Sequence, residues 1–211
     1  MTEITTIFCD VGGVLGTDGW DHRSRKRAVE HFKLDFDAFE ALHAKYAEAF
    51  DIGAISADQY MQEVVFTEPR HFAKVDFFQF MKNESIGFPE SLQVISALAA
   101  SGDYFMATIN NESVELNQYR IEKFGLKSLF SAFFSSCYLG IRKPDVGIFQ
   151  RALLISNKEA GEAVFIDDRQ GNLVNAQKLG MHTVLFENAP QLVKDLQALG
   201  VRVPTQAPSV A

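Results

Sequence analysis

Residues 5–15 of this chain read TTIFCDVGGVL, an apolar run that stops at Asp10 and is followed by a glycine pair. The pattern predicts a short buried strand whose carboxyl end presents the Asp10 carboxylate. Ligands of open α/β sheets bind at that end of the strands. A carboxylate there either binds a cation or attacks an electrophile. An aspartate in a glycine-containing turn is also ordinary turn composition, so this stretch alone leaves a purely structural role open.

Three later stretches place polar side chains at the end of an apolar run or in a loop. They supply a pair of amides, a lysine that precedes a proline, and a pair of acids: Asn110 and Asn111, Lys143, and Asp167 and Asp168. Adjacent acids repel each other unless a cation or a basic side chain balances them. Together with Asp10, these groups suit an anionic, metal-bound substrate such as a phosphate ester.

The four motifs, in this order along the chain, resemble those of the haloacid dehalogenase-like hydrolase superfamily, and the resemblance extends from Ile7 to about Leu199. The resemblance implies that Asp10 is the nucleophile and also a magnesium ligand. It further implies metal ligands at the Gly12 backbone carbonyl and at Asp168. Supporting roles follow for two neighbouring side chains, Asp167 and Asn172.

The resemblance also implies which residues hold the phosphate group: Gly12, Gly13, Asn110, Asn111 and Lys143.

Two positions depart from the common pattern of the phosphatases. Gly12 stands where many of them carry a second aspartate, which acts as general acid and base. Asn110 stands where the second motif commonly has Ser or Thr, and an amide can still hold a phosphate oxygen.

The order of the expected elements predicts an α/β fold with a doubly wound, Rossmann-like parallel sheet. Residues 1–15 and 88–211 supply the alternating strands and helices of this core domain, whereas residues 16–87 predict helices alone. Such an insertion resembles the all-helical cap domain of the family, which would cover the strand ends and exclude water. Ser56 and Gln59 fit a capping box at the start of one cap helix.

Charge and composition limit the classes of partner. The chain has 211 residues, 20 basic and 27 acidic, so its net charge is −7, which argues against a nucleic-acid partner. No apolar stretch approaches the roughly 20 residues of a membrane span, and the amino terminus lacks the layout of a secretory signal. A cytoplasmic enzyme is therefore expected, and a homodimer is left open.

The two cysteines, Cys9 and Cys137, are expected to be free core thiols rather than a disulfide.

Several residues outside the motifs receive a structural interpretation. The five histidines are scattered, and packing or surface roles are expected for them. His22 is kept as an exception because it closely follows the first motif. The basic run at residues 23–27 is expected to be a solvated helix face, although one of its arginines could reach a substrate anion.

The function implied by the resemblance is hydrolysis of a small-molecule phosphate monoester through an aspartyl-phosphate intermediate, with Mg²⁺ as cofactor. Electrostatic stabilisation by the metal and Lys143 would be the largest contribution to catalysis. Three alternatives remain: phosphomutase or phosphotransferase activity, haloacid dehalogenation on the same nucleophile, and a catalytically weakened binding module. The acid pair argues against dehalogenation, which needs no metal. The joint presence of Asp10, Lys143 and the acid pair argues against a binding module.

Overall fold

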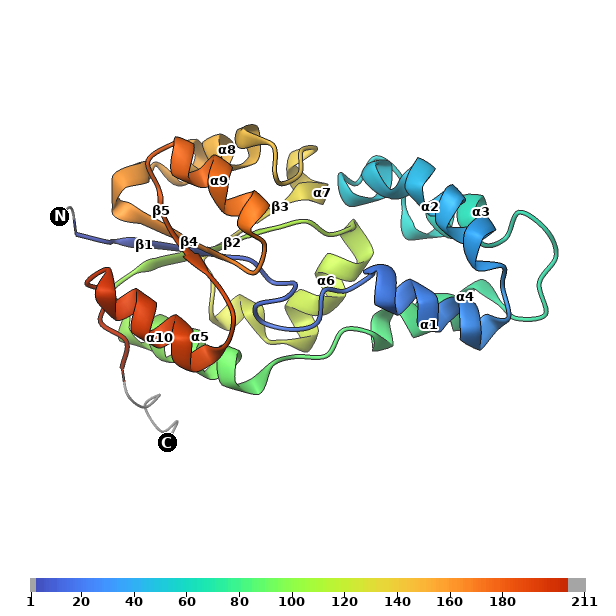
Figure 1. Cartoon of the computed structure of the whole chain (residues 1–211), viewed down its shortest axis with the longest axis horizontal. Helices are drawn as coiled ribbons and strands as arrows, with labels where there is room; N and C mark the ends of the chain where they lie inside the picture. Colours follow the sequence, from blue (N-terminus) through green and yellow to red (C-terminus); the bar gives the residue numbers. More distant parts are fainter. Residues whose placement is uncertain (1–2, 205–211) are drawn as a thin grey trace.

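A computed structural model describes residues 3–204. Five parallel strands form one sheet in the order β3-β2-β1-β4-β5 (Figure 1). Their bounds are β1 Thr6–Cys9, β2 Phe105–Asn110, β3 Ala132–Ser135, β4 Ala163–Asp167 and β5 His182–Leu185. This is the predicted doubly wound α/β architecture.

The strand order places a topological switch point between β1 and β4. The chain runs from β1 outward through β2 and β3, then returns to add β4 and β5 on the other side of β1. Helices leave the two central strands toward opposite faces, so a crevice opens at their carboxyl ends. Asp10 directly follows β1, and Asp167 ends β4. The two motifs farthest apart in sequence therefore meet at this crevice.

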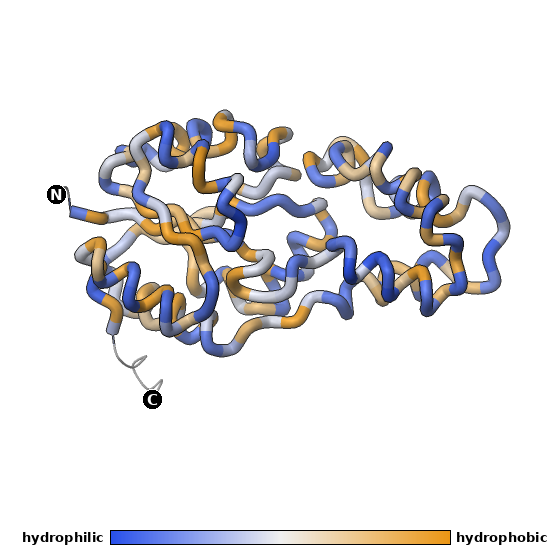
Figure 2. Tube along the Cα trace, in the orientation of Figure 1, coloured by the Kyte–Doolittle hydropathy of each residue, from blue (hydrophilic) through white to orange (hydrophobic). Residues whose placement is uncertain are grey.

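Helices cover both faces of the sheet, and each face has its own hydrophobic core. On one face, α5 (Pro89–Ser101), α6 (Val114–Lys123) and α10 (Ala189–Ala198) pack on the sheet residues whose side chains point to that side. On the other, α8 (Val146–Ser156) and α9 (Gln170–Lys178) pack around the rings of Phe8 and Phe165. Figure 2 shows the strands as the hydrophobic centre of this layered unit.

Four helices project beyond the carboxyl ends of the strands: α1 His22–Phe32, α2 Phe36–Asp51, α3 Ala57–Val64 and α4 Lys74–Asn83 (Figure 1). They enclose a separate hydrophobic cluster built largely of aromatic rings, with Tyr60 and Phe77 fully buried at its centre. The capping box at Ser56 and Gln59 starts α3. We use the term cap for these helices, and the domain limits at residues 16 and 87 remain an interpretation.

The remaining elements are short: η1 Leu126–Ser128, α7 Ser136–Leu139 and η2 Ala160–Glu162. Helix α7 was not expected from the sequence, and it lies just before the Lys143 loop. Ser113 directly precedes α6, but its side chain makes no capping hydrogen bond. Cys9 and Cys137 are both free thiols. Across residues 3–204, no helix combines the length and the apolar character that a membrane span requires.

Candidate active site

Asp10 occupies the carboxyl end of the central strand, and its carboxylate is held by two partners. Oδ1 accepts a 2.7 Å hydrogen bond from the backbone N–H of Val11, and Oδ2 lies 2.7 Å from Nζ of Lys143. Burial raises the pKa of Asp10 to about 7, although Lys143 beside it pulls the pKa down. The side chain is therefore oriented, desolvated and charge-paired, as a nucleophile requires.

Lys143 lies between two carboxylates rather than beside one. Its Nζ is 2.7 Å from Oδ2 of Asp10 and 2.7 Å from Oδ2 of Asp167, and the side chain is almost fully buried. Burial alone would lower the pKa of Lys143, but the two carboxylates raise it above its ordinary value. An ammonium has three N–H donors, so one remains for a further ligand in the crevice.

Asp167 has all its contacts within the protein. Besides Lys143, it accepts hydrogen bonds from the backbone N–H of Arg169 and from Nδ2 of Asn172, which lies 3.0 Å from both carboxylate oxygens. The side chain is fully buried. This arrangement supports the orienting roles expected for Asp167 and Asn172, because they fix the Lys143 ammonium in place.

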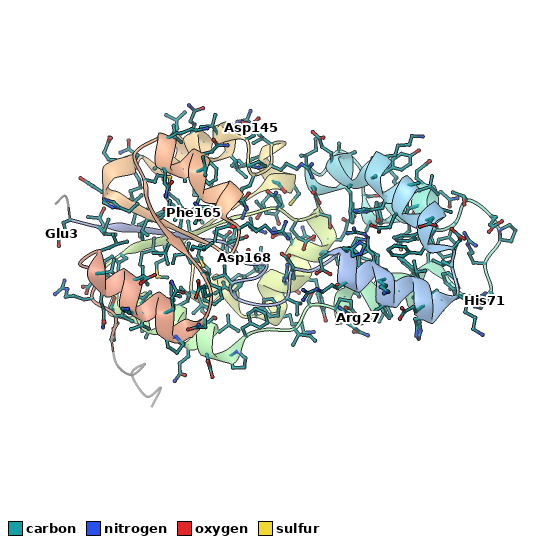
Figure 3. All side chains as sticks on the ribbon, viewed as in Figure 1. Glu3, Arg27, His71, Asp145, Phe165 and Asp168 are labelled. Atoms are coloured by element: carbon teal, nitrogen blue, oxygen red, sulfur yellow. The ribbon has the colours of Figure 1, made fainter. Side chains whose placement is uncertain are left out.

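Asp168, unlike Asp167, has a carboxylate oxygen that no protein group satisfies among the described residues. This oxygen, Oδ1, is buried. Ligand atoms of Asp10, Asp167 and Asp168 lie within 4.8 Å of one another. Burial, followed by the nearby Asp18 and Asp167, raises the pKa of Asp168. In Figure 3, Asp168 lies at the end of the sheet that faces the cap.

The charges around this cluster do not cancel. Four carboxylates, those of Asp10, Asp18, Asp167 and Asp168, meet the two cations Lys143 and Arg169. Two formal negative charges are left over. Hard divalent cations such as Mg²⁺ prefer carboxylate oxygens, so both the unpartnered oxygen and the residual charge fit such an ion.

The two predicted amides are placed differently from each other. The Asn110 side chain is buried, donates to Oδ1 of Asn117 and accepts from Oγ of Ser135, so it lies within the protein and does not line the crevice. Asn111 does line it, but its amide forms a two-way pair with the backbone of Lys143, at 2.8 and 2.9 Å. Asn111 therefore fixes the loop that carries Lys143.

Gly13 also differs from expectation. Its backbone N–H donates to the Gly16 carbonyl, so this N–H is not available to a phosphate. The position instead requires the absence of a side chain: φ is +74°, and an added Cβ would lie 2.3 Å from the Asp168 carboxylate. The N–H of Gly12 has no acceptor among the described residues, and Gly12 lines the crevice.

The crevice opens into a cavity of about 530 Å³ between the core and the cap. The motif residues Asp10, Gly12, Asn111, Lys143 and Asn172 form its floor. The charged or polar residues of the wall that the motifs did not identify are Asp18, Asp21, His22, Arg25, His43, Asp51, Glu112, Arg120, Arg142 and Arg169. Among these, the sequence offered a signal for His22, which closely follows the first motif, for Arg25, which belongs to the basic run, and for Arg169, which directly follows the acid pair.

Ion pairs compensate most of these charges. Arg25 forms a two-point contact with Glu40, and Arg142 bonds Asp51 at 2.7 Å. Deeper in the wall, Arg120 pairs with Glu112 at 3.2 Å. Burial raises the pKa of Glu112 to about 7 against the lowering effect of Arg120.

Comparison with known proteins agrees with this geometry. The family model described as "Hydrolase: haloacid dehalogenase-like hydrolase" matches residues 4–180. Flavin mononucleotide hydrolase 1 of Arabidopsis thaliana is 27% identical, and the match covers 90% of this chain and 85% of that protein. The drimenol cyclase drtB of Aspergillus calidoustus is 26% identical, with 88% of this chain but 31% of that protein covered. The chain thus spans most of the first relative and under a third of the second.

Solved structures share the whole architecture at low identity. A magnesium complex of a HAD family enzyme from Bacteroides thetaiotaomicron superposes with a TM-score of 0.75 at 16% identity, covering 92% of this chain and 100% of that one. A predicted HAD-like family hydrolase from Porphyromonas gingivalis gives 0.74 at 20% identity, covering 95% and 100%. These likenesses concern the fold. Since the family model spans most of the chain, this protein belongs to the haloacid dehalogenase-like hydrolases.

Proposed function

We propose that this hydrolase cleaves phosphate monoesters of small molecules, with Asp10 as the nucleophile. The observation that carries the proposal is the environment of two carboxylates at the switch point. Asp10 is oriented by Val11 and Lys143, while the neighbouring Asp168 has a buried oxygen without a partner among residues 3–204. An oriented nucleophile beside a carboxylate oxygen that can bind a cation suits phosphoryl transfer.

Magnesium would be held by Asp10, Asp168 and the Gly12 carbonyl, and when bound it would neutralise charge on the phosphoryl oxygens. The B. thetaiotaomicron enzyme, with a similar fold, has also been crystallised with magnesium and inorganic phosphate. In this chain, the residual charge at the strand ends supports the same cofactor.

Residues of this protein would carry out the nucleophilic attack and stabilise the charge that develops. The Asp10 carboxylate attacks phosphorus, an aspartyl P–O bond forms, and the ester P–O bond breaks with its electron pair on the leaving oxygen. Water then cleaves the aspartyl phosphate to release inorganic phosphate. Lys143 and Gly12 line the crevice, so the third N–H of Lys143 and the backbone N–H of Gly12 would stabilise the charge on the transferring group.

A phosphorylated small molecule is the partner that this cavity suits. Its volume of about 530 Å³ lies within the range of small-ligand sites. The similarity to a flavin mononucleotide hydrolase supports a phosphate monoester as substrate. Phosphomutase or phosphotransferase activity would require the intermediate to be shielded from water, and dehalogenation would leave the Asp168 position without a role.

A phosphate-release assay over a panel of phosphate monoesters, with and without Mg²⁺, tests the proposal. Asp10→Asn should abolish release. Asp103→Asn, which changes an aspartate outside the cavity, should leave release unchanged. Full release in excess chelator, or by Asp10→Asn, would contradict the proposal.

A further inference from the structure

A chain of hydrogen bonds runs through the cap core and ends at the cavity. Nε1 of Trp20 donates to the Tyr60 hydroxyl at 2.9 Å, and that hydroxyl lies 2.8 Å from Nδ1 of His43. Tyr60 is fully buried, and its ring stacks on Phe50 at 4.3 Å between centroids. The His43 ring lines the cavity. Trp20 and Tyr60, which are distant from His43 in sequence, therefore determine how this imidazole meets a ligand.

This series of hydrogen bonds determines which nitrogen of His43 carries the proton. An indole nitrogen only donates, so the Tyr60 oxygen accepts from Trp20 and retains its own O–H hydrogen. His43 Nδ1 is the one acceptor that the described residues offer to that hydrogen. The proton on the imidazole consequently belongs on Nε2, which has no protein partner among the described residues.

The imidazole in this position is neutral. Burial, together with the nearby Arg25, lowers the pKa of His43 to about 4, although Glu40 acts in the opposite direction. The neighbouring cations are also compensated, since Arg25 pairs with Glu40 and Arg142 with Asp51. His43 thus offers the cavity an uncharged N–H donor, and the neighbouring Arg25 and Arg142 are each paired with a carboxylate.

The neighbouring residues on α2 leave room for a group to reach that donor. His43, Ala47 and Asp51 are spaced four residues apart and all line the cavity, so they form one stripe on the helix. The small Ala47 side chain stands between the two polar ones. Apart from Ala47, the apolar side chains of the lining are Trp20 and Pro144. A polar leaving group fits such a wall better than a hydrocarbon does.

We propose that His43 is a specificity-determining residue that donates a hydrogen bond from Nε2 to an uncharged oxygen, such as a hydroxyl, on the leaving group of the substrate. Tyr60 and Trp20 are positioning residues, since they act through His43. This inference rests on the proposed phosphatase function, and it adds the chemistry of the group that the enzyme releases.

Two phosphate esters of matched shape and leaving-group basicity test it. 4-(Hydroxymethyl)phenyl phosphate carries the uncharged hydroxyl, and 4-ethylphenyl phosphate replaces that hydroxyl with a methyl group; the 3-substituted pair covers a second position. The measured quantity is the ratio of kcat/KM for the hydroxyl ester to that for the ethyl ester. A general loss of activity cancels in this ratio.

The natural protein should prefer the hydroxyl ester in at least one pair, and His43→Phe should lower the ratio by roughly tenfold, the value of one hydrogen bond. His43→Gln, which retains an N–H donor, should keep part of the preference. His31→Phe, which replaces an exposed histidine outside the cavity, should keep all of it. An unchanged ratio in His43→Phe, or no preference in the natural protein, would overturn the proposal.

Nitrogen NMR of the imidazole provides a measurement independent of turnover. In the natural protein, His43 should show a protonated Nε2 and an unprotonated Nδ1. Tyr60→Phe should mix the two tautomers and lower the ester ratio. A protonated Nδ1 in the natural protein would overturn this inference while leaving the phosphatase proposal intact. Hydrolysis of neither ester, combined with the expected tautomer, would instead refute the proposed function.

Discussion

The Asp18 carboxylate packs tightly against Gly12: its Oδ1 lies 3.0 Å from the position that a Cβ on Gly12 would take. The other carboxylate oxygen of Asp18 forms an ion pair with Arg169. The space that an acid at position 12 would enter is therefore filled by an acid from later in the chain. An ion-paired carboxylate accepts hydrogen bonds but has no proton to donate.

We predict from this relationship that turnover depends steeply on the basicity of the leaving group. General acid catalysis is typically worth about 10²–10⁴-fold, and neither Gly12 nor the paired Asp18 supplies it. Aryl and acyl phosphates should therefore exceed simple alkyl phosphates by roughly that factor. Turnover across a series of monoesters of graded leaving-group pKa measures the dependence, and a flat series would show that another residue donates the proton.

A substitution at Gly12 extends the same test. Gly12→Asp alone should fail to help alkyl esters, because the new side chain meets Asp18. Combined with Asp18→Gly, it should raise alkyl turnover selectively. Equal gains on aryl and alkyl esters would contradict the explanation.

Gly13→Ala should abolish activity. The added Cβ would lie 2.3 Å from the Asp168 carboxylate, at a backbone φ of +74° that disfavours any side chain. The metal ligand must therefore shift. Gly161→Ala is the matched control, since nothing lies within 4 Å of its added Cβ and its φ is ordinary. Phosphate release, and magnesium binding measured by calorimetry, should both fall in Gly13→Ala and remain unchanged in Gly161→Ala. Near-normal magnesium binding in Gly13→Ala would contradict the role of Asp168 as a metal ligand.

Lys143→Met should cost both turnover and stability. The ammonium separates the buried carboxylates of Asp10 and Asp167, and losing one partner of a buried ion pair typically costs about 3–5 kcal/mol. Lys127→Met, which removes an exposed lysine, should change stability by less than about 0.5 kcal/mol. Urea unfolding of both variants measures the difference. Similar midpoints for the two would mean that Lys143 does not bridge the carboxylates.

His43 should make the cap less stable at acidic pH. Its pKa is lowered to about 4 in the folded protein, against an ordinary value near 6.5. Between these values the unfolded chain binds the proton more readily, so stability is lost as the pH falls from 6.5 toward 4. The ring is only partly buried, so we expect a loss of about 1–2 kcal/mol. The stability of His43→Gln should fall less than that of the natural protein over this range, and parallel pH profiles would contradict the prediction.

The sheet and the positions of its catalytic side chains could be predicted because they depend on short-range patterns. Apolar runs that end in acids or a glycine turn locate β1 and β4, and parallel strands bring their carboxyl ends to one edge. The pairing of Lys143 with Asp10 follows from this order. Its second contact, to Asp167, depends on the exact path of the loop after α7, a helix that the sequence did not indicate.

Side-chain direction could not be predicted in the same way. Successive strand residues point to opposite faces, so a one-residue difference in register decides whether Asn110 enters the crevice or bonds Asn117. The cavity position of His43 depends on how α2 rotates against Tyr60, which is distant in sequence. Asp18 reaches Gly12 because the chain turns back at residues 13–15, which lie between them.

Trapping the phosphoryl group on Asp10 tests the central claim most directly. The protein would be mixed with phenyl phosphate and Mg²⁺, quenched rapidly in acid and digested, and the peptide that contains Asp10 would be analysed by mass spectrometry. The account predicts one phosphoryl group on Asp10, absent when chelator is present and absent in Asp10→Asn. Steady hydrolysis in excess chelator, or turnover with the phosphoryl group on a different residue, would contradict it.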